Sequence, residues 1–101
     1  MASQTLTRIK HDVDLQMPRM FVVIIHNDDV TTMDFVVEVL VDIFQKSPQE
    51  AAVLMMDVHE KGSGIAGVYV FDIAATKKSQ ADKRASEKGF PLKLTIREAL
   101  A

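Results

Sequence analysis

The sequence has no cysteine and no tryptophan, and it has only four glycines, three prolines and one tyrosine among 101 residues. Without cysteine the chain forms neither disulfides nor thiolate metal sites, and this composition favours a reducing compartment. No apolar run approaches the roughly 20 residues that cross a bilayer, and residues 1–19 lack the apolar segment of a secretory signal. We therefore expect a cytoplasmic protein that does not enter a membrane.

The sequence motifs of common enzyme classes are also missing. There is no cysteine nucleophile, no G-x-S-x-G sequence and no glycine-rich phosphate loop, and His59-Glu60 is followed by no second histidine at zinc-binding spacing. Asp28, Asp29 and Asp34 lie close together but lack the alternating ligands and the distal glutamate of a calcium loop. We expect no enzyme activity, no metal and no cofactor.

Charge is unevenly distributed along the chain, although the net charge is only −2. Residues 26–60 contain eight acidic residues and one lysine, whereas residues 61–101 contain eight basic and four acidic residues. The acidic segment disfavours phosphate and favours a cation, and the basic segment has no interleaved aromatic residues and no nucleic-acid-binding motif. Nucleic acid is therefore not an expected partner.

The apolar residues, 48% of the chain, are enough for one modest core. Residues 1–19 are polar and aperiodic, which predicts a flexible N-terminal arm, and residues 20–101 are expected to form a single core domain. The apolar, β-branched run at residues 20–26 predicts a central strand that is buried on both faces.

Helical periodicity and capping residues follow this strand. Thr31 or Thr32 can cap a first helix, in which apolar residues recur at helical spacing from residue 33 to 44. The sequence "SPQE" at residues 47–50 predicts a capping box at the start of a second helix that ends near Gly62.

The remaining sequence predicts a strand at residues 68–73, a helix from Thr76 to Lys88 and a strand at residues 91–97. The expected order is β-α-α-β-α-β. This is an α+β fold with a small three-stranded, largely antiparallel sheet that helices cover on one side.

Asn27, Asp28 and Asp29 directly follow the first strand, where such residues also commonly form turns and caps. On the second helix, His59 lies at helical spacing from Met55, so both side chains share one face. A histidine in this position is either a core residue bonded to backbone or part of a site, and methionines there either fill the core or contact a ligand.

A primary ammonium group is the ligand that suits these residues best. It has three donors and no acceptor, so a site must offer it acceptors and a negative charge, here the Asn27 carbonyl, an Asp carboxylate and a neutral His59 nitrogen. Apolar residues of both helices can form a pocket beside them: Met33, Val36, Met55 and Val58. A peptide N-terminus with a hydrophobic side chain fits this description.

The same residues carry a resemblance to a known family. The segments "NDDVTTMDFVVEVL", "LMMDVHEKG", "GVYVFDIAATK" and "FPLKLTI" resemble the ClpS family, bacterial adaptors of the AAA+ protease Clp. The resemblance implies an adaptor that binds bulky hydrophobic N-terminal residues (Phe, Tyr, Trp or Leu) of N-degron substrates and delivers them to the Clp ATPase–protease.

By this resemblance, Asn27, Asp29 and His59 hold the α-amino group, and Asp28 adds negative charge or a turn contact. Met33 acts as a gate against β-branched residues. The side-chain pocket as a whole is implied to consist of Thr31, Met33, Val36, Met55, Val58 and Leu92.

The resemblance also implies that Asp72 and Lys77 dock on the N-terminal domain of the ATPase, and that the arm acts during hand-over by a monomeric adaptor. The chain departs from the family pattern at Val30 and Thr32, and at His26, which several members replace with an aliphatic pocket residue. The alternative is a structural interaction domain like the C-terminal domain of the ribosomal stalk protein, which has a similar order of elements and no amine pocket.

Overall fold

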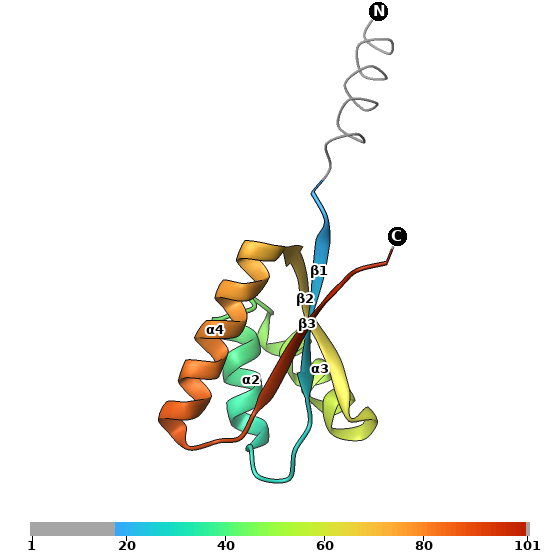
Figure 1. Ribbon diagram of the computed structural model, residues 1–101. Coiled ribbons are helices and arrows are strands. Elements are labelled where there is room, and N and C mark those ends of the chain that lie inside the picture. Colours follow the sequence, from blue (N-terminus) through green and yellow to red (C-terminus); the bar gives the residue numbers. More distant parts are fainter. Residues whose placement is uncertain (1–17, 101) are drawn as a thin grey trace, which may run out of the picture.

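The computed structural model describes residues 18–100, so the predicted arm lies outside the described residues except for Pro18 and Arg19. The division into arm and core stays a prediction. The elements are β1 (Met20–His26), α2 (Met33–Asp42), α3 (Pro48–Lys61), β2 (Ser63–Val70), α4 (Phe71–Lys88) and β3 (Lys93–Glu98) (Figure 1). The sheet has the strand order β2-β1-β3, and both pairings are antiparallel. The predicted β-α-α-β-α-β fold is confirmed.

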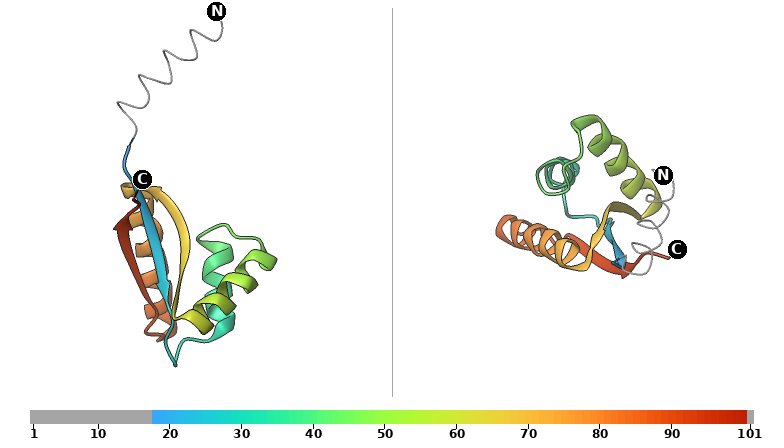
Figure 2. Two further views of the ribbon diagram at one scale, coloured as in Figure 1. Left: turned by 90° about the vertical axis from the view of Figure 1, so that its right-hand side faces the viewer. Right: turned by 90° about the horizontal axis from the view of Figure 1, so that it is seen from above.

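The central position of β1 is also as predicted, but its burial on both faces is not. Val23 and Ile25 are fully buried in the main hydrophobic core together with residues of all three helices. Val22 and Ile24 point to the opposite face, where they lie outside that core and pair with Val68 and Ile65, which are about half exposed. Helices therefore cover one face of the sheet, and the two further views show the strands beside a layer of helices (Figure 2).

The helix ends lie where local sequence places them. Thr32 caps α2 by accepting a hydrogen bond from the Phe35 backbone N–H at 3.2 Å. Ser47 and Glu50 form the predicted capping box at the start of α3, with both side chain–backbone distances at 3.1 Å. Gly62 ends α3 in the left-handed region, with φ of 94°, a conformation that most other residues adopt only at an energetic cost.

The boundary between β2 and α4 was predicted wrongly. The strand occupies residues 63–70 instead of 68–73. It therefore includes Gly64 and Gly67, and neighbouring side chains occupy the space beside both glycines. A Cβ at Gly64 would lie 2.9 Å from Val58 Cγ2, and one at Gly67 would collide with the Tyr69 ring. The helix α4 then begins at Phe71 rather than Thr76, without a side-chain cap, and the Phe71 ring packs edge-on against Phe21 with centroids 5.1 Å apart.

Ser47→Ala should destabilise the fold by about 0.5–2 kcal/mol, because the substitution removes the hydroxyl that accepts the Glu50 N–H. Urea unfolding of this variant measures the loss. Ser79→Ala is the matched control, since Ser79 is exposed within α4 and makes no cap. Equal stability of the two variants would show that the capping box is unimportant in this fold.

Candidate functional site

A cavity of about 370 Å³ opens between the β1–α2 loop, the start of α2 and the end of α3. It includes all four of the polar residues predicted for the site and all of the predicted apolar residues except Leu92. Val30 and Thr32 also line it. The complete lining is Asn27, Asp28, Asp29, Val30, Thr31, Thr32, Met33, Val36, Met55, Val58 and His59.

The loop reaches α3 through one backbone hydrogen bond. The Asn27 N–H donates to the Gly62 carbonyl at 2.9 Å, at the residue that ends α3. His59 lies in the last turn of the same helix. Residues that are about thirty positions apart in the sequence therefore line one cavity.

Asp28 determines the shape of the loop. One of its carboxylate oxygens accepts the backbone N–H groups of Val30, at 2.8 Å, and Thr31, at 2.6 Å, and the other accepts the Thr31 hydroxyl at 2.7 Å. Partial burial raises the pKa of Asp28, but the hydrogen bonds from Thr31 and Val30 outweigh it, so the pKa lies below its ordinary value of 3.8. Of the two roles implied for Asp28, the structure shows the turn contact.

The apolar lining has a buried floor and an exposed rim. Val36 and Val58 are 7% and 2% exposed, whereas Met33 and Val30 are 41% and 62% exposed. Met55, which is half-buried, lies one helical turn before His59 on α3. A side chain that enters this cavity would therefore displace water from buried valines beneath a flexible methionine.

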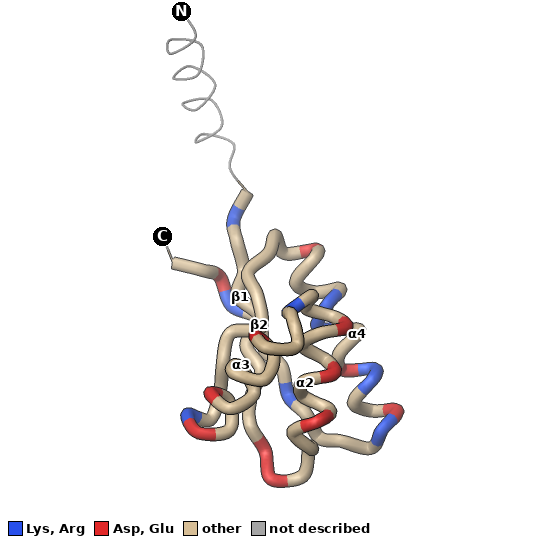
Figure 3. The backbone as a smooth tube through the Cα atoms, turned by 180° about the vertical axis from the view of Figure 1, so that it is seen from behind, with Lys and Arg blue, Asp and Glu red and all other residues tan. Residues whose placement is uncertain are grey.

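The polar residues at the cavity are available to a ligand. Asn27, Asp29 and His59 are exposed, and within residues 18–100 their side chains make no hydrogen bond or ion pair. The alternative of a core histidine is therefore wrong for His59. No group of three or more His, Asp or Glu side chains in the described chain could hold a metal ion. Figure 3 shows that the β1–α2 loop has only acidic charges, whereas α4 has basic residues interspersed with acidic ones.

Three predicted residues lie away from the cavity. Leu92, which directly precedes β3, is 7% exposed and belongs to the hydrophobic core. Asp72 lies exposed in the first turn of α4. Lys77 is half-buried, and its ammonium donates to the Ile43 carbonyl at 2.6 Å and to Gln45 Oε1 at 2.7 Å.

His26, at which the chain departs from the family pattern, does not line the cavity either. Its Nε2 lies 2.8 Å from the Thr95 hydroxyl of β3. Val30 and Thr32 are the lining residues that sequence reasoning did not assign to the pocket. Their position in the same six-residue loop as Asn27 and Asp29 is the signal that indicates them.

The fold and the cavity define a small α+β ligand-binding domain, and comparison with known proteins identifies its family. Residues 16–95 match the family described as ATP-dependent Clp protease adaptor protein ClpS. The chain belongs to the ClpS family. This membership agrees with the prediction of an adaptor rather than an enzyme, and it excludes the alternative of a ribosomal stalk-like domain.

Individual relatives cover nearly the whole chain. The ClpS adapter protein of Clostridium acetobutylicum is 51% identical over 90 residues, which are 89% of each chain. That of Acetivibrio thermocellus is 47% identical over 91% of this chain and 93% of its own. Among solved structures, Agrobacterium tumefaciens ClpS2 bound to L-phenylalaninamide is similar with a TM-score of 0.78 and 36% identity, covering 81% of this chain and 99% of that one.

The lowered pKa of Asp28 makes a prediction for acid stability. A carboxyl group whose pKa is lower in the folded chain stabilises it above the unfolded value, and this contribution disappears as pH falls through the folded value. Asp28→Asn should therefore be less stable than the parent chain at pH 6, and the difference should shrink below about pH 4. Urea unfolding at several pH values measures this, with Glu60→Gln as a control that removes an exposed charge from α3. A difference that does not depend on pH would contradict the role of the carboxylate.

Proposed function

We propose that this protein binds free N-termini whose first residue is bulky and hydrophobic (Phe, Tyr, Trp or Leu), and delivers such N-degron substrates to a Clp AAA+ ATPase–protease. The observation that carries the proposal is the placement of three acceptors, on Asn27, Asp29 and His59, that have no partner among residues 18–100 and lie beside a cavity with an apolar floor. The similar ClpS2 structure is bound to L-phenylalaninamide, a molecule with a free α-amine next to a phenyl side chain.

The polar part of the site suits a charged α-amine. An ammonium group carries three N–H donors, and the Asn27 carbonyl, the Asp29 carboxylate and a neutral His59 nitrogen are three acceptors from two different elements. Asp28 already uses its carboxylate oxygens in the loop, so its proposed role is to hold the neighbouring acceptors and to add negative charge. Among the described residues, no lysine or arginine lines the cavity to oppose a cation.

The apolar part suits the side chain of the same residue. Val36 and Val58 would meet its far end, and Met33, Met55 and Thr31 would enclose its sides. Met33 begins α2 at the rim of the cavity, and we propose that it crowds the space that a second branch on the ligand Cβ would need. Leu92 would support this wall only from the core.

Delivery requires a second surface, and we propose that Asp72 and Lys77 on α4 form the docking contact with the N-terminal domain of the ATPase. Asp72 is exposed at the start of α4, away from the cavity, so substrate and ATPase would not compete for the same residues. The monomeric state, the cytoplasmic location and the use of residues 1–17 during hand-over stay predictions. Within residues 18–100, every helix is too short or too polar to span a membrane.

Acetylation of a Phe-starting peptide should weaken its binding by at least about tenfold, because it removes the charge and leaves acceptors that the bound peptide covers without donors. Fluorescence anisotropy with the free and the acetylated peptide measures this. His59→Ala should weaken binding of the free peptide and reduce the difference between the two peptides. Equal affinity for both peptides would show that the cavity does not bind an α-amine.

Asp72→Ala should leave the affinity for the Phe peptide unchanged and slow the ATP-dependent degradation of a Phe-starting substrate. The reason is that Asp72 lies outside the cavity and within the proposed docking surface. Glu87→Ala is the control, since it removes an exposed acidic residue from the other end of α4. Calorimetry that measures binding of the variant to the isolated N-terminal domain of the ATPase tests whether the docking contact is lost. Degradation at the parental rate would show that Asp72 is not part of the docking surface.

A further inference from the structure

The helix α2 lines the cavity at one end and has an unfavourable charge distribution at the other. Met33 and Val36, from its first turns, line the cavity. Its last turn has no basic residue and contains Asp42. The carboxyl end of a helix carries a partial negative charge, so an acidic residue there is unfavourable unless cations from elsewhere are close.

Lys77 of α4 supplies one such cation. Its ammonium donates to the carbonyl of Ile43, the residue that caps α2, at 2.6 Å and to Gln45 Oε1 at 2.7 Å. Gln45 has a left-handed backbone with φ of 52°, so the chain reverses at the point where Lys77 binds. The same ammonium lies 5.3 Å from the centre of the Tyr69 ring on β2. Lys77 thus joins the end of α2 to both α4 and the sheet.

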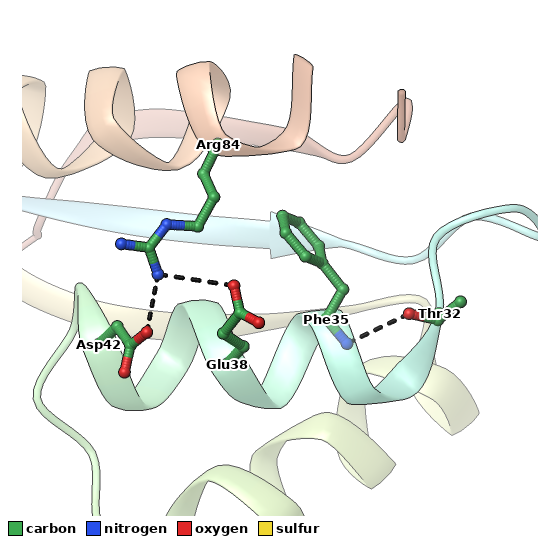
Figure 4. Close-up of polar contacts among 5 residues, drawn as sticks. All are labelled: Thr32, Phe35, Glu38, Asp42 and Arg84. Atoms are coloured by element: carbon green, nitrogen blue, oxygen red, sulfur yellow. Dashed lines mark hydrogen bonds and ion pairs between the residues drawn. The ribbon is translucent and has the colours of Figure 1, made fainter. Parts of the chain in front are cut away.

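Arg84 supplies the second cation, two helical turns further along α4. One of its terminal nitrogens lies 2.8 Å from Asp42 Oδ2 and 3.6 Å from Glu38 Oε2, so it bridges two acidic residues on successive turns of α2 (Figure 4). Figure 4 also shows the Thr32 cap at the opposite end of the helix, and Thr32 itself lines the cavity. Contacts with α4 therefore hold the half of α2 that is remote from the cavity.

We infer that Lys77 and Arg84 are positioning residues for the ligand cavity, acting through α2. This inference rests on the proposed function, and it gives Lys77 a second role in addition to the proposed docking contact. A helix is stiff along its axis, so a change in the position of its carboxyl end moves Met33 and Val36 relative to Met55 and Val58 on α3. Without the two cations, the wall formed by α2 would no longer keep its distance from the wall formed by α3.

The test compares two adjacent lysines. Lys77→Met removes the contacts with α2 and keeps the aliphatic chain. Lys78→Met is the matched control, because Lys78 pairs with Asp82 of its own helix at 2.6 Å and the charge change is identical. Lys77→Arg should retain more of the peptide affinity than Lys77→Met, since it keeps a cation with several N–H donors. Arg84→Gln tests the second contact and remains informative if Lys77→Met does not fold.

We expect the full-length Lys77→Met chain to bind a fluorescent Phe-starting peptide about tenfold more weakly, and Lys78→Met to stay within about twofold of the parent. The preference for Phe over Val as the first residue should also decrease in Lys77→Met, whereas loss of global stability alone would not change that ratio in folded samples. If Lys77→Met and Lys78→Met both fold, equal peptide affinities and equal Phe-over-Val preferences would overturn the inference. If Lys77→Met does not fold but Arg84→Gln does, unchanged peptide affinity of Arg84→Gln would overturn it.

A second readout does not depend on the ligand. The methyl resonance of Met33, assigned from a Met33→Leu variant, should move in the carbon–proton NMR spectrum of Lys77→Met and stay in place in Lys78→Met. If the parent chain does not bind the Phe peptide, the proposed function fails, but this spectrum still decides whether Lys77 positions α2. An unchanged Met33 resonance in Lys77→Met would overturn the inference.

Discussion

The reversal of the chain at Gly62 is the constraint on which the site depends. Its left-handed backbone ends α3 and starts β2 directly, and its carbonyl accepts the Asn27 N–H at the end of β1. The pairing of His26 with Ser63 places the two strand ends side by side. A residue with a side chain would resist this conformation, and a different turn would separate the loop that carries Asn27 from the helix that carries His59. The polar half of the cavity thus follows from backbone geometry.

Packing on one face of the sheet explains how so small a domain can present both a cavity and a docking surface. The core uses alternate residues of β1 and meets α4 through three small, fully or almost fully buried residues, Ala74, Ala81 and Ala85. Small residues allow α4 to lie close to the strands, so α2 and α3 form the rest of the same layer beside it. The cavity then lies between α2 and α3, where the layer is not closed by larger side chains. Asp72, at the start of α4, is left exposed away from this opening.

Electrostatics connect these parts of the layer. The acidic excess of residues 26–60 favours a cationic ligand, but only some of these acidic side chains lie at the cavity, and others pair with a basic residue of α4. Glu38 and Asp42 both form ion pairs with Arg84 of the basic segment, which offsets part of their negative charge. Asp29 remains unpaired among the described residues and borders the cavity. Exposed ion pairs contribute little stability individually, but Arg84 bridges two carboxylates on one helix, so its main effect is to orient α2.

Much of the fold could be predicted because its signals are local. Apolar periodicity, the Ser47 capping box and the left-handed glycine at residue 62 depend on neighbours within one or two turns of chain, and each appears in the structure as expected. The pattern also indicated most of the cavity residues, since they directly follow the first strand or lie at helical spacing on the next two helices. The start of α4 at Phe71 could not be predicted, because no side chain caps this helix and its first residue packs instead against Phe21, fifty residues earlier in the sequence. The surroundings of Leu92, His26 and Lys77 depend on strand pairing and helix packing between distant parts of the chain. Tertiary structure alone therefore decided that Leu92 and His26 lie outside the cavity and that Lys77 holds the end of α2.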